Sequence, residues 1–363
     1  MNLAVVAFVP HPPASASGRY RVYQMARELA THGVDLTVRP FLDERAFARL
    51  YVPGWTVTKA MDVLRGARRR WQDVGEAGRF DLALVHREIW PLVGDAPRRR
   101  LARSQPRWVV DFDDAVYLPN VSAANRAFAW LKPVGQPARL VAGARAVAAG
   151  NAWLADWARR QRPGRPPEEV EVIPTAVDTG RWTPGARARG PLRLAWIGSH
   201  STALFLEPLR AALARLAAKH PGLELHVVGA TFDAPGVRVV SHEWDERTEI
   251  ECLRRADIGL APLPDDDWAR GKCGLKLLLY MALGLPAVAS RVGVHGGIVS
   301  HCVDGMLADT PEAFEPALET LLSDPALRER LGRAARATVE ARYSVRVVAP
   351  RLATLLKRAA ETA

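Results

Sequence analysis

The sequence predicts an α/β protein made of two domains, each with a doubly wound parallel sheet. The chain has 363 residues, which is more than a single hydrophobic core usually holds. Short apolar runs alternate along the whole chain with amphipathic helical stretches, the pattern of parallel sheets covered by helices. A stretch rich in proline, glycine and turn-forming residues, 172–191, divides this pattern into two similar halves.

Twelve strands are expected, six in each half. In the first half they lie near residues 2–9, 34–40, 81–85, 107–111, 145–149 and 170–173. In the second half they lie near 192–197, 223–228, 237–240, 257–261, 286–290 and 306–308. Residues 19–33 predict a helix of about four turns, in which Gly33 supplies a left-handed cap. The expected domains are 1–178 and 179–345, and whether the helix within 346–363 packs back onto the first domain stays open.

Composition narrows the class of protein. Hydrophobic residues make up 48% and charged residues 25% of the chain, as in ordinary globular proteins. The three cysteines are widely spaced and form no CxxC pair, which argues against a disulfide framework or a cysteine zinc site. The opening "MNLAVVAFVPHPP" reads as a strand and not as a signal peptide, and no apolar run is long enough to span a bilayer. A cytoplasmic protein is predicted, with peripheral attachment to the inner membrane face as the alternative.

The net charge of +11 is uneven: residues 1–180 hold 26 Lys and Arg against 18 Asp and Glu. The clusters at 65–70 and 97–100 contribute much of this excess, although a genomic preference for arginine explains it equally well. A basic surface of this kind attracts nucleic acid, anionic lipid or a phosphorylated substrate. No nucleic-acid partner is predicted, because the clusters lack a recognised motif or interleaved aromatic residues. Residues 55–71 are consistent with a basic helix at a membrane surface, but an ordinary exposed helix beside the ligand site is favoured.

The segment "GKCGLK", 271–276, follows a predicted strand and opens an apolar helix. Backbone N–H groups at a helix start carry partial positive charge and bind phosphate readily. Lys272 and Lys276 are four residues apart, so they are expected on one face of the first turn, where they would neutralise a diphosphate without a metal ion. About equally plausible from the residues alone is a solvated surface network with Asp265, Asp266 and Asp267.

"KCGLKLLLYMALGLPAVASRVGVHGGIV" and the later "DGML" resemble the donor-site signature of the family-4 group of GT-B glycosyltransferases. "LRLAWIGS", "LELHVVG", "GNAWLADWARR" and "VEVIPTAVDTGRWTP" also resemble segments of that family, in the same order. The resemblance covers nearly the whole chain. It implies two Rossmann-like domains facing across a cleft, with the acceptor in the first and the nucleotide sugar in the second.

The chain departs from the family pattern at two places. By register, the glutamates of the family's Glu-x7-Glu motif fall at Gly271 and Leu279. The turn at 198–202 also lacks the basic residues that the family often has there. The resemblance therefore implies a variant donor site, in which Lys272 and Lys276 supply the missing positive charge.

Two groups of polar residues follow strands of the first domain. Gly18, Arg19 and Arg21 lie in the turn expected at 15–24, where the glycine would allow close approach and the arginines would contact anions or simply be solvated. His86, Arg87 and Glu88 end one strand, and Asp111, Asp113 and Asp114 end the next. By resemblance, Asp113 occupies the place of a family histidine beside the donor sugar. "DFD" matches a D-x-D metal motif only weakly, no metal is predicted, and backbone hydrogen bonds are favoured for Asp111 or Asp114.

The resemblance implies a retaining, metal-independent hexosyltransferase of class EC 2.4 that needs no cofactor. Its donor would be a nucleotide-diphosphate sugar, with UDP- and GDP-sugars favoured, and its acceptor the hydroxyl of a glycan, a lipid-linked molecule or a secondary metabolite. The alternatives are a nucleotide-sugar 2-epimerase and a non-catalytic basic binding protein. The expected catalytic residues are Asp113, Lys276 and Lys272. Expected donor contacts are Gly18, Arg19, Gly198, Ser199, His200, Glu243, Trp244, Lys272, Cys273, Gly274, Leu275 and Lys276. Expected acceptor contacts are Arg21, His86, Arg87, Glu88 and Asp114.

Overall fold

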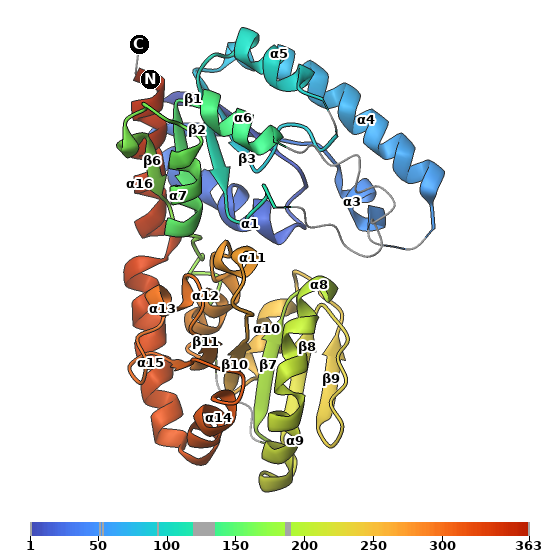
Figure 1. Ribbon diagram of the computed structural model, residues 1–363, viewed down its shortest axis with the longest axis vertical. Coiled ribbons are helices and arrows are strands. Elements are labelled where there is room, and N and C mark those ends of the chain that lie inside the picture. Colours follow the sequence, from blue (N-terminus) through green and yellow to red (C-terminus); the bar gives the residue numbers. More distant parts are fainter. Residues whose placement is uncertain are drawn as a thin grey trace. The chain divides into compact units, whose positions relative to one another are not determined.

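The chain folds into two compact α/β units, seen here in a computed structural model (Figure 1). The structure describes residues 2–50, 52, 54–92, 94–118, 135–185 and 190–361, so part of the expected linker lies outside the described residues. Unit 1 comprises Met1–Ala176, Gly271–Cys273 and Val345–Ala363, and unit 2 comprises Val177–Arg270 and Gly274–Ser344. The segment "GKCGLK" is thus divided between the two units, which its sequence does not indicate.

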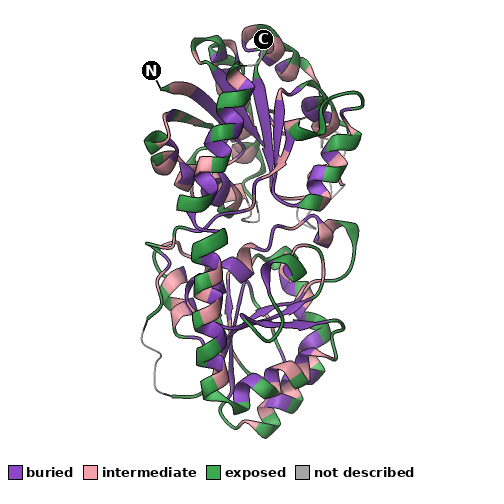
Figure 2. Ribbon diagram, turned by 90° about the vertical axis from the view of Figure 1, so that its left-hand side faces the viewer, coloured by how far each residue is buried: buried purple, intermediate pink, exposed green. Residues whose placement is uncertain are grey.

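Unit 1 contains a six-stranded parallel sheet in the order β2-β1-β3-β4-β5-β6. Its strands are β1 (Leu3–Val9), β2 (Val34–Pro40), β3 (Leu82–His86), β4 (Trp108–Phe112), β5 (Ala146–Ala149) and β6 (Val170–Val172). Each begins and ends within about two residues of the position expected from the sequence, because continuous apolar runs are the mark of strands buried on both faces. The strands β3, β4 and β5 are buried throughout and β1 is buried from Val5 to Val9, as the buried colour at the centre of this sheet in Figure 2 shows, whereas the edge strands β2 and β6 are only partly buried.

Helices and short 3-10 turns connect the strands of unit 1. The first group is α1 (Ala16–Arg21), η1 (Tyr23–Met25), α2 (Ala26–Thr31), α3 (Glu44–Leu50), α4 (Thr56–Gly75) and η2 (Ala77–Arg79). The second group is α5 (Ala96–Ser104), α6 (Gln136–Gly143), α7 (Ala152–Arg160), η4 (Pro167–Glu169) and α16 (Val345–Glu361). The single helix expected over 19–33 is wrong, since η1 separates α1 from α2. Gly33 does adopt a left-handed backbone, with a φ of 72°.

One face of this sheet is covered by α2 and α16. Leu29 of α2 and Val348, Leu352 and Leu356 of α16 are buried in the same hydrophobic cluster as Val5 of β1. The helix α16 also contacts β3, β4 and β5. The C-terminal helix therefore belongs to the core of the first unit, although unit 2 lies before it in the sequence.

The other face is anchored to α4 by a buried arginine. The guanidinium of Arg70 is fully buried and donates hydrogen bonds to the carbonyls of Ile89, Val9 and Arg39, at 2.8–2.9 Å. It also lies 5.0 Å from the centroid of the Phe8 ring. Burial lowers the pKa of Arg70 to about 10, which still leaves the group charged at neutral pH. The basic cluster at 65–70 is therefore only partly a surface feature.

Unit 2 repeats the architecture with a parallel sheet in the order β12-β11-β10-β7-β8-β9. Its strands are β7 (Arg193–Ile197), β8 (Glu224–Val228), β9 (Arg238–His242), β10 (Ile258–Ala261), β11 (Ala287–Ser290) and β12 (Met306–Ala308). The helical elements up to α12 are α8 (His200–Ala203), η5 (Leu204–Leu209), α9 (Arg210–Lys219), α10 (Glu249–Arg254), α11 (Asp267–Arg270) and α12 (Leu275–Ala282). The remaining helices are α13 (His295–Ile298), α14 (Phe314–Ser323) and α15 (Pro325–Arg342). Within the described ranges, every helix is too short or too polar to cross a bilayer.

Candidate functional site

In unit 1, polar side chains gather where the order of strands reverses. The chain leaves β1 for β2 on one side, while β3 pairs with β1 on the other. Doubly wound sheets bind ligands beyond the carboxyl ends of their strands at such a switch point. Ser17 lies in α1, which follows β1, and His86 is the last residue of β3. His86 is the register partner of Asp111 in β4, so pairing of these parallel strands places the two side chains together.

The inner end of this polar network is buried. The guanidinium of Arg21 forms an ion pair with Asp111 and donates to the carbonyl of Ile173 at 2.7 Å. The Nδ1 atom of His86 lies 2.6 Å from Oδ2 of Asp111, and its Nε2 lies 2.7 Å from Oγ of Ser17. His86 is fully buried, and the side chains of Arg21 and Asp111 are each 2% exposed. These groups therefore hold one another in place.

The outer end of the network is more accessible. The hydroxyl of Ser17 donates to Oδ1 of Asp113 at 2.9 Å, and Nε of Arg87 donates to the same oxygen at 2.7 Å. Arg87 also lies 3.8 Å from Asp114, whose two carboxylate oxygens are each 3.4 Å from Nζ of Lys272. The side chains of Asp113, Asp114, Lys272 and Arg87 are 14–27% exposed. The polar network thus runs from a buried Arg–Asp pair to a partly open group of charges.

Both central aspartates are ionised in this setting. Burial alone would raise the pKa of Asp111, but the charge of Arg21 and the hydrogen bond from His86 outweigh it, so that pKa is lowered. Burial likewise opposes ionisation of Asp113, and the charges of Arg87 and His86 hold its pKa well below the usual range. A carboxylate with so low a pKa accepts hydrogen bonds well but is a weak proton acceptor.

Arg87 adopts a strained backbone at the end of β3. Its φ is 63°, in the left-handed region that residues other than glycine rarely occupy. Its N–H donates to the carbonyl of Asp111 at 2.7 Å, and its side chain pairs with Asp113. Such conformations cost about 1–3 kcal/mol and occur most often at functional sites, where surrounding contacts enforce them.

Several expectations for unit 1 are wrong in detail. The segment 15–24 is mostly helical and not an open turn: Gly18 lies buried inside α1 with an ordinary φ. Arg19 and Arg21 are buried and not solvated, and the ion pair of Arg21 occupies the guanidinium that was expected to contact an acceptor.

The strand ends differ from expectation too. Both ring nitrogens of His86 are engaged, one with Ser17 and the other with Asp111, and its contact with an acceptor stays a prediction. Asp111 binds side chains and not a backbone amide, whereas Asp114 does accept from the N–H of Ala115. Glu88 is half-buried, and its N–H donates to the carbonyl of His86 at 2.8 Å.

The segment 271–273 packs within unit 1. Asn151 donates from Nδ2 to the carbonyl of Lys272 at 2.9 Å, and Cys273 lies so close to Gly150 that a Cβ there would come within 2.3 Å of its sulfur. Burial raises the pKa of the Cys273 thiol strongly, so it stays protonated. Because α12 begins only at Leu275, Lys272 precedes the helix. The expectation that Lys272 and Lys276 share the first helical turn is therefore wrong.

In unit 2, Lys276 lies at the corresponding switch point. The chain leaves β7 for β8 on one side, while β10 pairs with β7 on the other. Gly198 follows β7, and Lys276 lies in the first turn of α12, the helix that precedes β11. The Nζ atom of Lys276 is 4.1 Å from the centroid of the Trp196 ring and 3.4 Å from Oγ1 of Thr202. A Cβ on Gly198 would come within 2.7 Å of this ammonium, so only glycine leaves room for it.

Tyr280 fixes the position of α12 on the sheet. Its buried hydroxyl accepts from the N–H of Ile197 in β7 at 3.0 Å and donates to the carbonyl of Leu260 in β10 at 3.2 Å. Its ring lies against Gly259, where a Cβ would come within 2.4 Å of it. The hydroxyl bridges the two strands of the switch point one helical turn after Lys276, and therefore positions that lysine.

The remaining residues expected at the donor are spread around this point. Gly274 precedes α12 with a φ of 69°, Leu275 begins the helix, and Ser199 and His200 are exposed at the start of α8. The N–H of Ser199 donates to Oγ1 of Thr202 at 3.2 Å, which links the turn after β7 to Lys276. Glu243 is exposed, and half-buried Trp244 donates to the buried Glu249 at 2.7 Å. In the part of the chain that the structure describes, no three His, Cys, Asp or Glu side chains are grouped to hold a metal ion.

Lowering the pH below neutrality is expected to destabilise the protein through His295, which is buried beside Lys276. Burial first, and then the Lys276 charge, lower the pKa of His295 to about 4, against about 6.5 in an unfolded chain. Between these values only the unfolded chain binds the proton, so stability is complete above about pH 6.5 and is lost as the pH falls towards 4. The free energy of unfolding in urea should be about 1 kcal/mol lower at pH 5.5 than at pH 7 for this reason.

The matched variants for this pH prediction are His295→Gln and His32→Gln, of which the second changes a histidine whose side chain is 38% exposed. The part of the difference due to His295 should vanish in His295→Gln and persist in His32→Gln, while His11, whose pKa is also lowered to about 4, keeps its own contribution in both variants. An equal pH dependence in both variants would contradict the assignment to His295.

Comparison with known proteins agrees with this arrangement. The sequence profile of the family "Glycosyl transferases group 1" matches residues 192–324, which include β7, Lys276 and Tyr280. The D-inositol 3-phosphate glycosyltransferase of Acidothermus cellulolyticus is 28% identical over 89% of this chain and 82% of its own length. The chain is a glycosyltransferase with the GT-B fold, and its residues 192–324 match the group 1 profile. Group 1 enzymes transfer a sugar from a nucleotide-sugar donor and retain the anomeric configuration.

A second relative and two solved structures extend the comparison. The second relative is the GDP-mannose-dependent alpha-(1-6)-phosphatidylinositol dimannoside mannosyltransferase of Mycobacterium tuberculosis. It is 32% identical to this glycosyltransferase over 43% of this chain and 35% of its own length. Sucrose-phosphate synthase from Thermosynechococcus elongatus superposes with a TM-score of 0.69 at 17% identity, covering 98% of this chain and 99% of that one. HepE from Anabaena, solved with UDP and glucose, superposes with a TM-score of 0.67 at 13% identity, covering 98% of this chain and 100% of that one. At these identities the structures support the fold alone.

Sequence reasoning about this glycosyltransferase missed several residues that complete its two sites. They are Ser17, Asn151, Trp196, Thr202 and Tyr280. Ser17 and Thr202 are ordinary helix-start residues with no distinguishing pattern. From the sequence, Trp196 and Tyr280 look like ordinary core residues. In the structure, Trp196 contacts the ammonium of Lys276, and the Tyr280 hydroxyl bonds the backbones of β7 and β10.

Proposed function

We propose that the enzyme is a metal-independent hexosyltransferase in which unit 2 holds a nucleotide diphosphate sugar, UDP- or GDP-linked, and unit 1 contributes to the acceptor. The observation that carries this proposal is the position of Lys276 in unit 2. Its ammonium lies beside the glycine turn after β7, at the first turn of α12, where the strand order reverses. A cation and a set of backbone N–H groups at a switch point form a suitable site for a diphosphate.

Lys276 would act on the leaving group. Cleavage of the sugar–phosphate bond leaves negative charge on the terminal phosphate, and a cation already in place stabilises that charge without further reorganisation. Thr202 and Trp196 restrict the ammonium, so little conformational entropy is lost when the donor binds. His295, which stays neutral beside it, adds no second charge.

Asp113 would orient the acceptor or a sugar hydroxyl. It is partly exposed, and Ser17 and Arg87 hold one of its oxygens. Because its pKa is held low, it is better suited to accept a hydrogen bond than to remove a proton. This agrees with the course that the resemblance implies, in which the departing phosphate takes the proton of the attacking hydroxyl on the same face.

The donor site is proposed to be the variant form in which Gly271 and Leu279 replace the family glutamates. Leu279 is 3% exposed and packs in the core, which supports a ribose contact made by some other group. The names of the relatives support a phosphorylated or lipid-linked acceptor, because they act on D-inositol 3-phosphate and phosphatidylinositol dimannoside. The proposal includes a peripheral contact between unit 1 and a membrane surface.

A panel of UDP- and GDP-sugars tests this function. The melting temperature should rise with one class of nucleotide diphosphate, and release of that nucleotide should depend on an added acceptor, for which inositol 3-phosphate is the first choice. Turnover is expected to persist in EDTA. Conversion of the donor sugar without acceptor would instead identify an epimerase, and no thermal response to any nucleotide would identify a binding protein.

A further inference from the structure

The helix α4 carries an apolar face that the described part of the chain does not cover. Val57, Met61, Leu64 and Trp71 are 75%, 46%, 67% and 41% exposed. At about 100° per residue, they fall within a sector of about 80° along four turns of the helix. Trp55, immediately before the helix, is 61% exposed. Single exposed apolar residues are common, but several on one face of a helix, here interrupted only by Arg68, mark an interaction surface.

This face points away from the core of unit 1. Asp62, Gly66, Arg70 and Val74 lie on the opposite side of α4 and are all buried. Gly66 approaches the sheet so closely that a Cβ would come within 2.7 Å of the Phe41 carbonyl. The three backbone hydrogen bonds of Arg70 described above hold this side in place. The exposed face is therefore rigidly presented, on the side of α4 that the described residues of unit 1 leave open.

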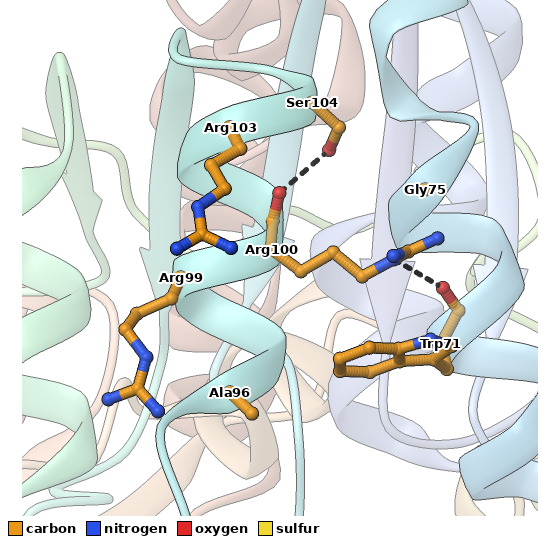
Figure 3. Close-up of a pocket in the computed structure, with 7 residues that line it drawn as sticks. All are labelled: Trp71, Gly75, Ala96, Arg99, Arg100, Arg103 and Ser104. Atoms are coloured by element: carbon orange, nitrogen blue, oxygen red, sulfur yellow. Dashed lines mark hydrogen bonds between the residues drawn. The ribbon is translucent and has the colours of Figure 1, made fainter.

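Arginines surround the apolar face. Arg65 flanks it on α4, whereas Arg68 lies within the same sector between Leu64 and Trp71, and both are exposed. At its C-terminal end, Trp71 borders a surface hollow of about 500 Å³ that Arg99, Arg100 and Arg103 of α5 also line. Figure 3 shows Arg100 reaching across to Trp71, while Arg99 and Arg103 extend along one side of α5. Arg100 donates to the Trp71 carbonyl at 3.1 Å and stacks 4.7 Å from its ring centroid.

We propose that the apolar face of α4 and the arginines around it bind the surface of an anionic phospholipid bilayer. In this arrangement Val57, Met61 and Leu64 enter the interface between headgroups and acyl chains, to a depth of about 5–10 Å. The arginines contact lipid phosphates, and the hollow beside Trp71 accommodates one of them. Tryptophan and arginine suit this zone, since each has an apolar body and a polar or charged group. The inference rests on the proposed function only for its biological purpose, which is to bring the enzyme to a lipid-linked acceptor. Binding to the bilayer itself needs no nucleotide-sugar donor.

Charge and chemistry favour a bilayer over other partners. Two copies meeting through this face would bring like-charged arginines together, which disfavours a symmetric dimer. Nucleic acid would use the arginines but not the apolar side chains between them. An anionic bilayer satisfies both kinds of group at once. It also explains why the apolar and basic residues share one end of unit 1, which α4 and α5 form together (Figure 1).

Co-sedimentation of the full chain with vesicles tests the proposal. The protein should bind vesicles of phosphatidylcholine and phosphatidylglycerol, bind phosphatidylcholine alone far less, and dissociate progressively with salt. Leu64→Glu should lower the partition coefficient at least tenfold, about the effect of losing one buried leucine. Its matched control is Val303→Glu, which adds the same charge at a residue of unit 2 that is 57% exposed and should bind as the parent does.

The contribution of the arginines is tested in the same assay. Arg103→Gln should weaken binding to the anionic vesicles several-fold, whereas Arg346→Gln, at an exposed arginine of α16, should not. Equal partitioning of Leu64→Glu and Val303→Glu would overturn the proposal. So would a salt-independent partition, or a dimer in sedimentation velocity that Leu64→Glu dissociates. Turnover of Leu64→Glu in solution with a water-soluble acceptor should match the parent, so a failed glycosyltransferase assignment is distinguishable from failed membrane binding.

Discussion

Lys276→Ala is expected to lower kcat by about 100-fold or more while the protein remains folded. Removing one preorganised group that stabilises charge in a transition state usually costs two to three orders of magnitude. The loss should be larger in kcat than in KM, because Lys276 acts mainly on charge that appears as the bond breaks. Steady-state release of the nucleotide diphosphate measures both constants.

Two further lysine variants make this result interpretable. Lys276→Arg keeps the charge but not the fit between Trp196 and Thr202, so it should recover only part of the lost activity. Lys219→Ala removes a lysine that is 55% exposed at the end of α9 and should behave as the parent enzyme. Lys276→Ala also loses a cation–π contact worth about 0.5–2 kcal/mol, so thermal melting must accompany the kinetics. Unchanged turnover in a folded Lys276→Ala protein would remove the lysine from the mechanism.

Asp111→Asn is expected to destabilise unit 1 by about 3–5 kcal/mol at pH 7. The substitution leaves the guanidinium of Arg21 buried without its counter-charge, which is among the most costly changes a core can undergo. It also removes the acceptor that orients His86, so Ser17 and Asp113 lose their support. Urea denaturation of the parent and the variant measures the first effect, and residual turnover measures the second.

The pH dependence of this difference identifies its cause. The folded pKa of Asp111 lies below the value of about 4 in an unfolded chain, so its contribution is complete above pH 4 and is lost as the pH falls further. The gap between parent and Asp111→Asn should therefore narrow in acid. Asp114→Asn, which changes a partly exposed member of the same network, should cost less than about 1 kcal/mol. A gap that stays constant down to pH 3 would point to packing and not to charge.

The sequence predicts the strands well because their signal is local. Residues 146–149 and 287–290, for example, are short apolar runs between turn formers, and burial on both faces of a parallel sheet requires such runs. The helix over 19–33 fails because its interruption depends on distant partners. Tyr23 donates to the His11 carbonyl and Gln24 to the Ala176 carbonyl, and neither contact leaves a mark in the helical periodicity.

The site shows the same limit. Polar residues at strand ends identified both the His86 and the Asp111 regions, since parallel strands bring their carboxyl ends to one edge. The role of each residue there depends on which charged side chain it pairs with in the folded protein. The sequence does not show that Arg21 lies against Asp111 or that Lys272 lies against Asp114. The prediction for Lys276 rests on a local pattern, its place next to a glycine-flanked helix start.

The place of α16 in unit 1 affects how the protein is made. Its side chains complete the hydrophobic cluster of the first sheet, yet the ribosome reaches them only after all of unit 2. Domains usually fold in the order of their synthesis, from the N-terminal end. Until α16 is made, only α2 covers this face of the first sheet, and the rest of the face stays exposed while unit 2 is synthesised. The unit that is translated first is thus the one that is finished last, and its apolar face is open to chaperones throughout that interval.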